Sequence, residues 1–400
     1  MRRIKIWRWV PTAVLLWVGL TTGSWASTNL ANTSFAAGGN LVFRTPENCT
    51  SQHLYRVECT TSLVSAVWAC VRTVIGVGPD NSVSNGLTSA ADAAFYRVVA
   101  TSNSATFVDG SYMVIDVSGG TSVTSYPVAY YGTKTAVPGG ITNDVYKTTQ
   151  VLMRYIPNGV FIMGSPTDEP GRHINEAQHQ VTLTNDFYMG VFEVTQKQWE
   201  RVMGNWPSYF DNVTYRDSRP VEMVSYYQIR ENPDNNDDPA VDWPANSVVN
   251  ANSFMGKLRA KTGLSALDLP TESQWEYACR AGTTTALNSG KNHQTEANMS
   301  EVGRYLYNGG SEFWQDSSPN AGTATAGTYL PNAWGLYDMH GNVREWCLDW
   351  FPGYEGSGRV FRGGDWSVGA EPCRAAYRSN PYEPDSRIDK IGFRLSRTLP

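Results

Sequence analysis

The chain has 400 residues, of which 41% are hydrophobic and 17% are charged, so it is neither a disordered chain nor a coiled coil. Its formal net charge at pH 7 is −5. Phosphate binding needs clustered lysine and arginine, so we expect no nucleic-acid partner for this acidic chain. The length allows two or three domains of about 150 residues each.

The first 26 residues have the pattern of a secretory signal peptide. Four basic residues precede an apolar run from Trp9 to Leu20, and the small residues Ser24 and Ala26 follow. The run is shorter than the roughly 20 residues of a membrane span. We therefore expect cleavage and export to the periplasm or the extracellular space, with no membrane association afterwards. A retained N-terminal anchor is the alternative. Cleavage would remove four positive charges and change the net charge to −9.

Residues 27–146 are predicted to form a β-rich module of unknown role. The segment is rich in Ser, Thr and Gly and contains three β-favouring runs. These runs are Leu63–Trp68, Phe95–Val99 and Tyr112–Val117. Pro138–Gly140 is the expected seam before the next domain.

Helix start signals appear beyond residue 147. Thr195 with Gln198 and Thr271 with Gln274 match the T-x-x-Q capping box, in which each side chain bonds the other residue's backbone N–H. The predicted helices are Gln196–Met203, Ser253–Lys261 and Glu272–Arg280. Short strands are expected at Gly159–Met163, Gln180–Leu183, Phe187–Val191 and Gly392–Leu395. Loops fill most of the remainder.

Five motifs follow one another in the second half of the chain, which then closes with Ile391–Arg394. They are Ile156–Ser165, Tyr188–Thr195, Leu269–Gly282, Asn332–Trp346 and Phe361–Trp366. In sequence and order they resemble the formylglycine-generating enzyme family, also called the sulfatase-modifying-factor domain, over residues 150–397. The resemblance implies an α+β fold of C-type-lectin-like topology that is rich in loops.

The resemblance also bears on catalysis. The family's oxidases convert a cysteine of a sulfatase to formylglycine, using two cysteines just after a Gly-Gly-Ser turn to bind copper and the substrate thiol. Two thiolates suit Cu(I), which is a soft ion. Here Asp365 replaces the serine, and the segment Asp365–Arg378 contains one cysteine, Cys373. We therefore expect no catalytic residues and no copper.

Two functions remain open at this point. The first is a binding or accessory module without oxidase activity, which recognises a protein, a peptide or a glycan. The second is an enzyme, either a copper-dependent oxidase that converts a sulfatase cysteine or another enzyme of the same superfamily. The single cysteine favours the first.

Six cysteines fall into two groups of three. The pairing of Cys49, Cys59 and Cys70 in the first group stays open. In the second group the resemblance implies a disulfide between Cys279 and Cys373, with a redox thiol at Cys373 as the alternative. The third member, Cys347, is expected to be a buried thiol. These positions are all in the sequence as printed.

The resemblance further implies a calcium loop at Asp338, Gly341, Val343 and Glu345, with side-chain oxygens at its ends and carbonyl oxygens between them. Asn298 matches one ligand of a second family site. We therefore expect calcium as a structural cofactor. In the alternative interpretation, Asp338 and Glu345 cap turns or pair with an arginine, either Arg344 or Arg362.

Other polar residues are given structural roles. His340 has no metal-binding partner at a suitable spacing, so we expect it to face solvent or to donate a hydrogen bond. One polar loop is expected to be solvated rather than catalytic, and it contains Glu169, His173, Glu176 and His179.

Overall fold

The computed structural model describes residues 111–231, 243–244, 247–309 and 321–399 in full, and the strands before them by their backbone pairing. The chain divides into two compact units, residues 1–109 and 110–400. The predicted signal peptide lies outside the described residues except for Leu15–Leu16. Within the described residues, no helix is long and apolar enough to cross a membrane.

The first unit consists of strands, as the sequence indicates. One sheet has the order β1-β7-β4-β5 and the other has the order β2-β3-β6. Their bounds are Leu15–Leu16 (β1), Thr33–Ala36 (β2), Asn40–Arg44 (β3), His53–Thr60 (β4), Ala69–Gly76 (β5), Asp80–Val83 (β6) and Phe95–Thr101 (β7). Cys59 lies opposite Ala69 and Cys70 opposite Glu58 in the β4–β5 ladder, while Cys49 lies outside the described residues.

A six-stranded sheet of order β14-β18-β13-β10-β8-β9 organises the second unit. Its strands are β8 (Tyr112–Asp116), β9 (Val128–Tyr131), β10 (Gln150–Ile156), β13 (Phe187–Gly190), β14 (Leu267–Asp268) and β18 (Ser396–Thr398). Since β8 pairs with β10, with Met113 opposite Met153, it belongs to this unit. The second compact unit therefore begins at residue 110, earlier in the chain than the boundary expected near residue 146.

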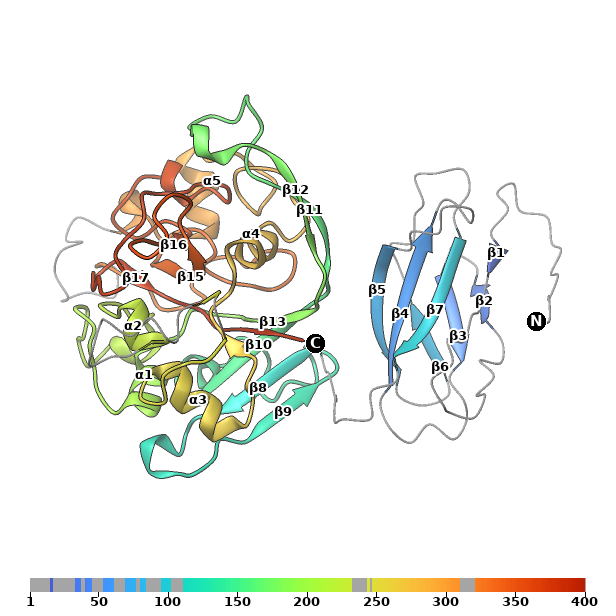
Figure 1. The fold of residues 1–400 in the computed structure, drawn as a ribbon, viewed down its shortest axis with the longest axis horizontal. Coiled ribbons are helices and arrows are strands. Elements are labelled where there is room, and N and C mark those ends of the chain that lie inside the picture. Colours follow the sequence, from blue (N-terminus) through green and yellow to red (C-terminus); the bar gives the residue numbers. More distant parts are fainter. Residues whose placement is uncertain are drawn as a thin grey trace. The chain divides into compact units, whose positions relative to one another are not determined.

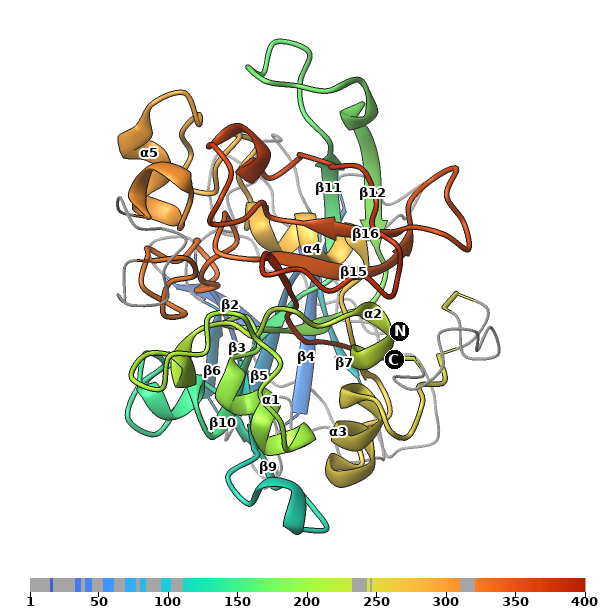
Figure 2. The same ribbon diagram turned by 90° about the vertical axis from the view of Figure 1, so that its left-hand side faces the viewer.

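Two smaller sheets complete the second unit (Figures 1 and 2). A ribbon is formed by β11 (Gly159–Met163) and β12 (His179–Leu183), and the other sheet by β15 (Arg344–Trp350), β16 (Arg359–Arg362) and β17 (Ile391–Gly392). The single strand expected at Gly392–Leu395 is thus wrong, because this segment mostly links β17 to β18.

The helices are short, and the capping boxes place two of them correctly. Thr195 and Gln198 form a reciprocal capping box, as do Thr271 and Gln274. The helices are α1 (Gln196–Met203), α2 (Tyr226–Ile229), α3 (Phe254–Thr262), α4 (Glu272–Arg280) and α5 (Glu296–Val302). Single 3-10 turns occur at Gly120–Ser122, Asp144–Lys147, Ile174–Glu176, Arg216–Ser218, Leu306–Asn308 and Glu371–Cys373.

Aromatic side chains hold these elements together. Both ribbon views place α1 beside α3 (Figures 1 and 2), where the Trp199 and Phe254 rings stack with centroids 5.2 Å apart. Trp275 of α4 and Trp346 of β15 are fully buried. Stacked aromatic side chains supply much apolar area in a domain with so little regular structure.

Candidate functional site

The turn at Gly363 and Gly364 leads into a buried carboxylate. Asp365 is fully buried, and its Oδ2 accepts a hydrogen bond of 2.6 Å from Nε of Arg344 on β15. Its Oδ1 accepts from the backbone N–H and the hydroxyl of Ser367, at 2.8 and 2.6 Å. Both carboxylate oxygens of Asp365 therefore accept hydrogen bonds from protein groups. Asp365 is held in place rather than poised to react.

The three cysteines of this unit are buried and unpaired. Cys279, Cys347 and Cys373 are free thiols, each fully buried, so the predicted disulfide between Cys279 and Cys373 is absent from the structure. Burial raises the pKa of Cys279 to about 12 and also raises those of Cys347 and Cys373. A thiol that stays protonated is a poor nucleophile and a poor metal ligand.

His340 contacts both Cys279 and Cys373. Its Nδ1 donates to the carbonyl oxygen of Cys373 at 2.7 Å, and its Nε2 accepts from the backbone N–H of Asn288 at 3.0 Å. The Cys279 sulfur lies 3.8 Å from the same Nε2. One ring therefore contacts both cysteines, whose sulfurs belong to separate core clusters.

These contacts also fix the state of His340. A carbonyl oxygen can only accept and a backbone N–H can only donate, so the neutral ring carries its proton on Nδ1. Burial lowers the pKa of His340 to about 4. The expected hydrogen-bonding role is confirmed, whereas the expected exposure to solvent is wrong because the side chain is fully buried.

The loop expected to bind calcium is buried and partly satisfied by protein groups. Glu345 accepts hydrogen bonds of 2.6 Å from Nε and Nη2 of Arg394 and from the indole N–H of Trp275. An arginine therefore pairs with Glu345, as the alternative interpretation held, but it is neither Arg344 nor Arg362. Asp338 Oδ2 accepts from the Gly327 N–H at 2.6 Å, and Asp338 Oδ1 has no partner among the described residues.

Negative charge accumulates around this loop. Glu193 is fully buried and accepts from Asn342 Nδ2 at 2.7 Å and from the Val343 N–H at 3.2 Å. Burial, together with the charges of Asp338 and Glu345, raises the pKa of Glu193 well above its usual range. Burial raises the pKa of Asp338 to about 6. Of these three carboxylates Glu345 is hydrogen-bonded to Arg394, while Glu193 and Asp338 act on that guanidinium through their charge.

The oxygen atoms of this loop are only partly suited to bind a cation. Asp338 offers a buried carboxylate oxygen without a partner, which suits a cation, whereas both oxygens of Glu345 are already bonded. No group of three or more His, Cys, Asp and Glu side chains in the described ranges is arranged to hold a metal. Of the other predicted ligands, Gly341 donates its N–H to Gly363, and Asn298 donates its side-chain amide to Asn292. Calcium therefore stays a prediction.

Comparison with known proteins gives the family. Residues 142–399 match the family model of the sulfatase-modifying factor enzyme 1-like domain. This chain belongs to that family. The chain is 34% identical over 220 residues to "Chaperone protein LppX" of Paenibacillus barcinonensis, a match that covers 49% of this chain and 75% of that protein.

Two further relatives carry the name of the family's enzyme. The chain is 27% identical over 311 residues to the "Formylglycine-generating enzyme" of Mus musculus, covering 64% of this chain and 78% of that one. It is also 25% identical over 284 residues to the "Inactive C-alpha-formylglycine-generating enzyme 2" of Bos taurus, covering 62% and 88%. Membership of the sulfatase-modifying-factor family therefore does not decide between an enzyme and an inactive protein.

One ionic cluster of this sulfatase-modifying-factor domain was not expected from the sequence. Glu169 and Glu176 were predicted to be solvated, but both are buried against Arg374. Arg374 Nη1 lies 2.6 Å from Glu169 Oε1, and Nη2 lies 2.8 Å from Glu176 Oε1. His173 and His179 are exposed, as predicted. The arginine lies about 200 residues further along the chain, so no local pattern reveals the pairing.

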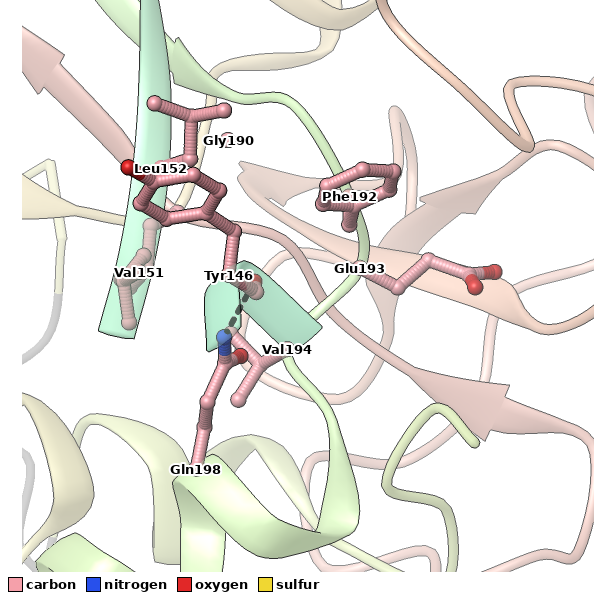
Figure 3. Close-up of a pocket in the computed structure, with 9 residues that line it drawn as sticks. Tyr146, Val151, Leu152, Gly190, Phe192, Glu193, Val194 and Gln198 are labelled. Atoms are coloured by element: carbon pink, nitrogen blue, oxygen red, sulfur yellow. Dashed lines mark hydrogen bonds between the residues drawn. The ribbon is translucent and has the colours of Figure 1, made fainter. Parts of the chain in front are cut away.

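A narrow pocket beside the central sheet carries no chemistry of its own (Figure 3). Gln198 Nε2 donates to the carbonyl oxygens of Tyr146 and Gln150, at 2.9 and 2.7 Å. The Glu193 carboxylate is directed away from the other lining residues (Figure 3). The lining residues are Tyr146, Val151, Leu152, Gly190, Phe192, Glu193, Val194, Gln198 and Leu395. Since its polar groups are already bonded, we assign this pocket to packing.

Proposed function

We propose that this chain is an exported accessory or binding module of the sulfatase-modifying-factor family, without cysteine-oxidase activity. The observation that carries the proposal is the turn after Gly364. Its carboxylate, Asp365, is bonded to Arg344 and Ser367, and Cys373 is buried with its sulfur 3.5 Å from the Gly369 carbonyl oxygen. An oxidase would need two accessible thiolates there.

The relatives support an accessory role. One curated relative is named a chaperone and another is named inactive, so the same domain is found in proteins whose names do not describe oxidation. A fold accommodates many functions, and the site decides between them. The proposed ligand of the module is a protein, a peptide or a glycan.

The oxidase alternative can be tested directly. The purified chain is incubated with copper and a peptide that contains Cys-x-Pro-x-Arg, and the peptide is then followed by mass spectrometry. We expect no mass change, whereas an active formylglycine-generating enzyme in a parallel reaction converts the cysteine to an aldehyde. Aldehyde formed by this chain would overturn the proposal, and a Cys373→Ser variant would then show whether Cys373 takes part.

Export is a part of the proposal that a separate measurement tests. The apolar run from Trp9 to Leu20 and the small residues before position 27 support cleavage after Ala26. Expression of the full chain should yield a periplasmic or secreted protein whose N-terminal sequence begins at Ser27. An uncleaved N-terminus in the membrane fraction would instead identify an anchor.

We also propose that calcium binds at the Asp338 loop. Asp338 would supply Oδ1, and Glu345 would have to exchange Arg394 for the ion. A ligand that binds only the folded state raises the melting temperature. We therefore expect a higher melting temperature in millimolar calcium than in chelator, and no such difference in an Asp338→Asn variant. Equal melting temperatures of the unsubstituted chain in both conditions would contradict calcium binding.

A further inference from the structure

Arg344 is a charged side chain whose hydrogen-bonding capacity is only partly used. It lies at the start of β15, where its backbone N–H donates to the Lys390 carbonyl oxygen at 2.8 Å. Its side chain is 13% exposed, while its partner Asp365 is fully buried. The pair therefore joins a buried carboxylate to a partly exposed guanidinium.

The guanidinium of Arg344 is fixed in orientation. Nε donates to Asp365 Oδ2 at 2.6 Å, and Nη1 approaches the Tyr382 hydroxyl at 3.4 Å. Its central carbon lies 5.1 Å from the centroid of the Phe361 ring and 6.0 Å from that of the Tyr382 ring. Among the described residues, nothing accepts a hydrogen bond from Nη2. A planar group held in this way loses little conformational entropy when it binds a further partner.

Other arginines of this domain show that one guanidinium group can bind two carboxylates. Arg374 binds Glu169 and Glu176, Arg230 binds Glu231 and Asp268, and Arg362 pairs with Glu272 and Glu276. Each of these three guanidinium groups thus takes two carboxylates. Arg344 has one carboxylate, Asp365, and its side chain is 13% exposed.

We propose that Arg344 binds a carboxylate of the ligand through its two terminal nitrogens, in the manner of a second carboxylate on the buried arginines. The inference rests on the proposed function, since it names the chemistry that the binding module recognises. The ligand is a peptide or protein that presents an acidic side chain or its C-terminal carboxylate. Arginine and carboxylate match in a planar, bidentate geometry.

The surrounding charges favour a group with a single negative charge. Lys390 lies near the site, with Nζ 5.8 Å from the Trp366 ring centroid, but Asp389 lies next to it in sequence and carries the opposite charge. Together with Arg344 and Asp365, the four charges cancel. A carboxylate would leave one net negative charge, whereas a doubly charged phosphate would leave two.

Arginine labelling tests the inference on the full chain. Phenylglyoxal modifies accessible guanidinium groups, and digestion with mass spectrometry gives the labelling rate of each arginine. N-acetylglutamic acid α-amide supplies a side-chain carboxylate, N-acetylglycine supplies a terminal one, and N-acetylglutamine amide supplies none. With a carboxylate probe in excess we expect the labelling of Arg344 to slow about threefold or more. The carboxylate source that binds more tightly is the probe that slows the labelling at the lower concentration.

Arg378 provides an internal control. Its side chain is 18% exposed, similar to Arg344, but its Nε and Nη2 are both bonded to Glu272, at 2.6 and 2.8 Å. We expect the probes to leave the labelling of Arg378 unchanged. Unchanged labelling of Arg344, or equal slowing by N-acetylglutamine amide, would overturn the inference.

Variants keep the test independent of labelling. The acetyl methyl signal of the probe should broaden in the presence of the unsubstituted chain, and an Arg344→Gln variant should abolish the broadening. The matched variant Arg378→Gln should retain it, with the near-UV circular dichroism of both variants confirming the fold. Broadening that survives in Arg344→Gln would contradict the inference. If Arg344 does not bind a carboxylate, the result of the oxidase test is unaffected, because that test measures only aldehyde formation.

Discussion

Two arginine sites in the same domain differ in what surrounds them. Arg374 is fully buried, and its terminal nitrogens bond two carboxylates and a backbone carbonyl oxygen from the loop between β11 and β12. Arg344 reaches the surface and bonds one carboxylate. The first arrangement joins two segments of the fold and leaves no room for a ligand. The second leaves Nη2 of a partly exposed arginine without an acceptor among the described residues.

The difference separates a structural charge from one suited to binding. A buried charge is retained only when its partners compensate the cost of removing it from water. A charge at the surface carries no such requirement, so unfilled donors there cost little and remain for a ligand. The predictions below test this contrast, beginning with the largest expected effect.

Removal of Arg374 should be strongly destabilising. An Arg374→Met substitution leaves Glu169 and Glu176 buried without a cation, and breaking a buried pair in this way costs about 3–5 kcal/mol. Urea unfolding should show this loss. An added Glu169→Gln and Glu176→Gln pair should restore part of it, because neutral amides are less costly to bury. A loss below about 1 kcal/mol would place Arg374 in the same class as a surface charge.

Glu222 extends the contrast to a buried carboxylate without an arginine. It accepts from the N–H groups of Tyr209 and Phe210, at 3.0 and 2.9 Å. Burial raises its pKa from 4.5 to about 7. The folded protein therefore holds this proton more tightly than the unfolded chain, so its contribution to stability is complete below about pH 4.5 and is lost as the pH rises through about 7.

A Glu222→Gln variant isolates that contribution. The free energy of unfolding of the unsubstituted chain, relative to the variant, should fall by up to about 3 kcal/mol as the pH rises through this range. Denaturant unfolding of both proteins at several pH values measures this difference in the free energy of unfolding. The contributions of other titrating groups are the same in both proteins and cancel in the difference. A difference that does not depend on pH would show that Glu222 is better solvated than its burial indicates.

Substitution of Arg344 should have the smallest effect on stability. Its side chain is 13% exposed, so water can replace part of what Arg344 gives to Asp365, although Asp365 itself is buried. We expect Arg344→Gln to lower the free energy of unfolding by less than Arg374→Met does, since the amide can still donate to Asp365. A loss as large as that of Arg374→Met, measured by urea unfolding, would make Arg344 structural and remove the contrast.

Local signals in the sequence predicted local structure well. The threonine and glutamine of each capping box are three residues apart, and α1 and α4 each begin directly after the threonine of their box. Both helices have the predicted bounds. The predicted helix Ser253–Lys261 is displaced by one residue, because Ser253 is the N-cap and Gly263 ends the helix. Strand β11 was also predicted with its observed bounds.

Contacts between distant residues could not be predicted in the same way. Glu169 and Glu176 appeared solvated because nothing near them in the sequence is basic, and their partner Arg374 lies on another loop. The same limit applies to Glu345, whose partner Arg394 follows β17. Asp365 was recognised as a replacement for serine, yet its bond to Arg344 depends on the register of β15 and β16, which brings Arg344 beside this turn.

Native-state labelling of the three cysteines of the second unit is the most direct test of a non-oxidase function. The folded full chain is treated with iodoacetamide, and Cys279, Cys347 and Cys373 are examined by peptide mass spectrometry before and after unfolding without reductant. We predict no modification in the folded state and modification of all three after unfolding, because the structure buries each as a free thiol. Cysteines that stay unmodified after unfolding would indicate a disulfide. Rapid modification of Cys373 in the folded protein would reveal an accessible reactive thiol and contradict the proposed function.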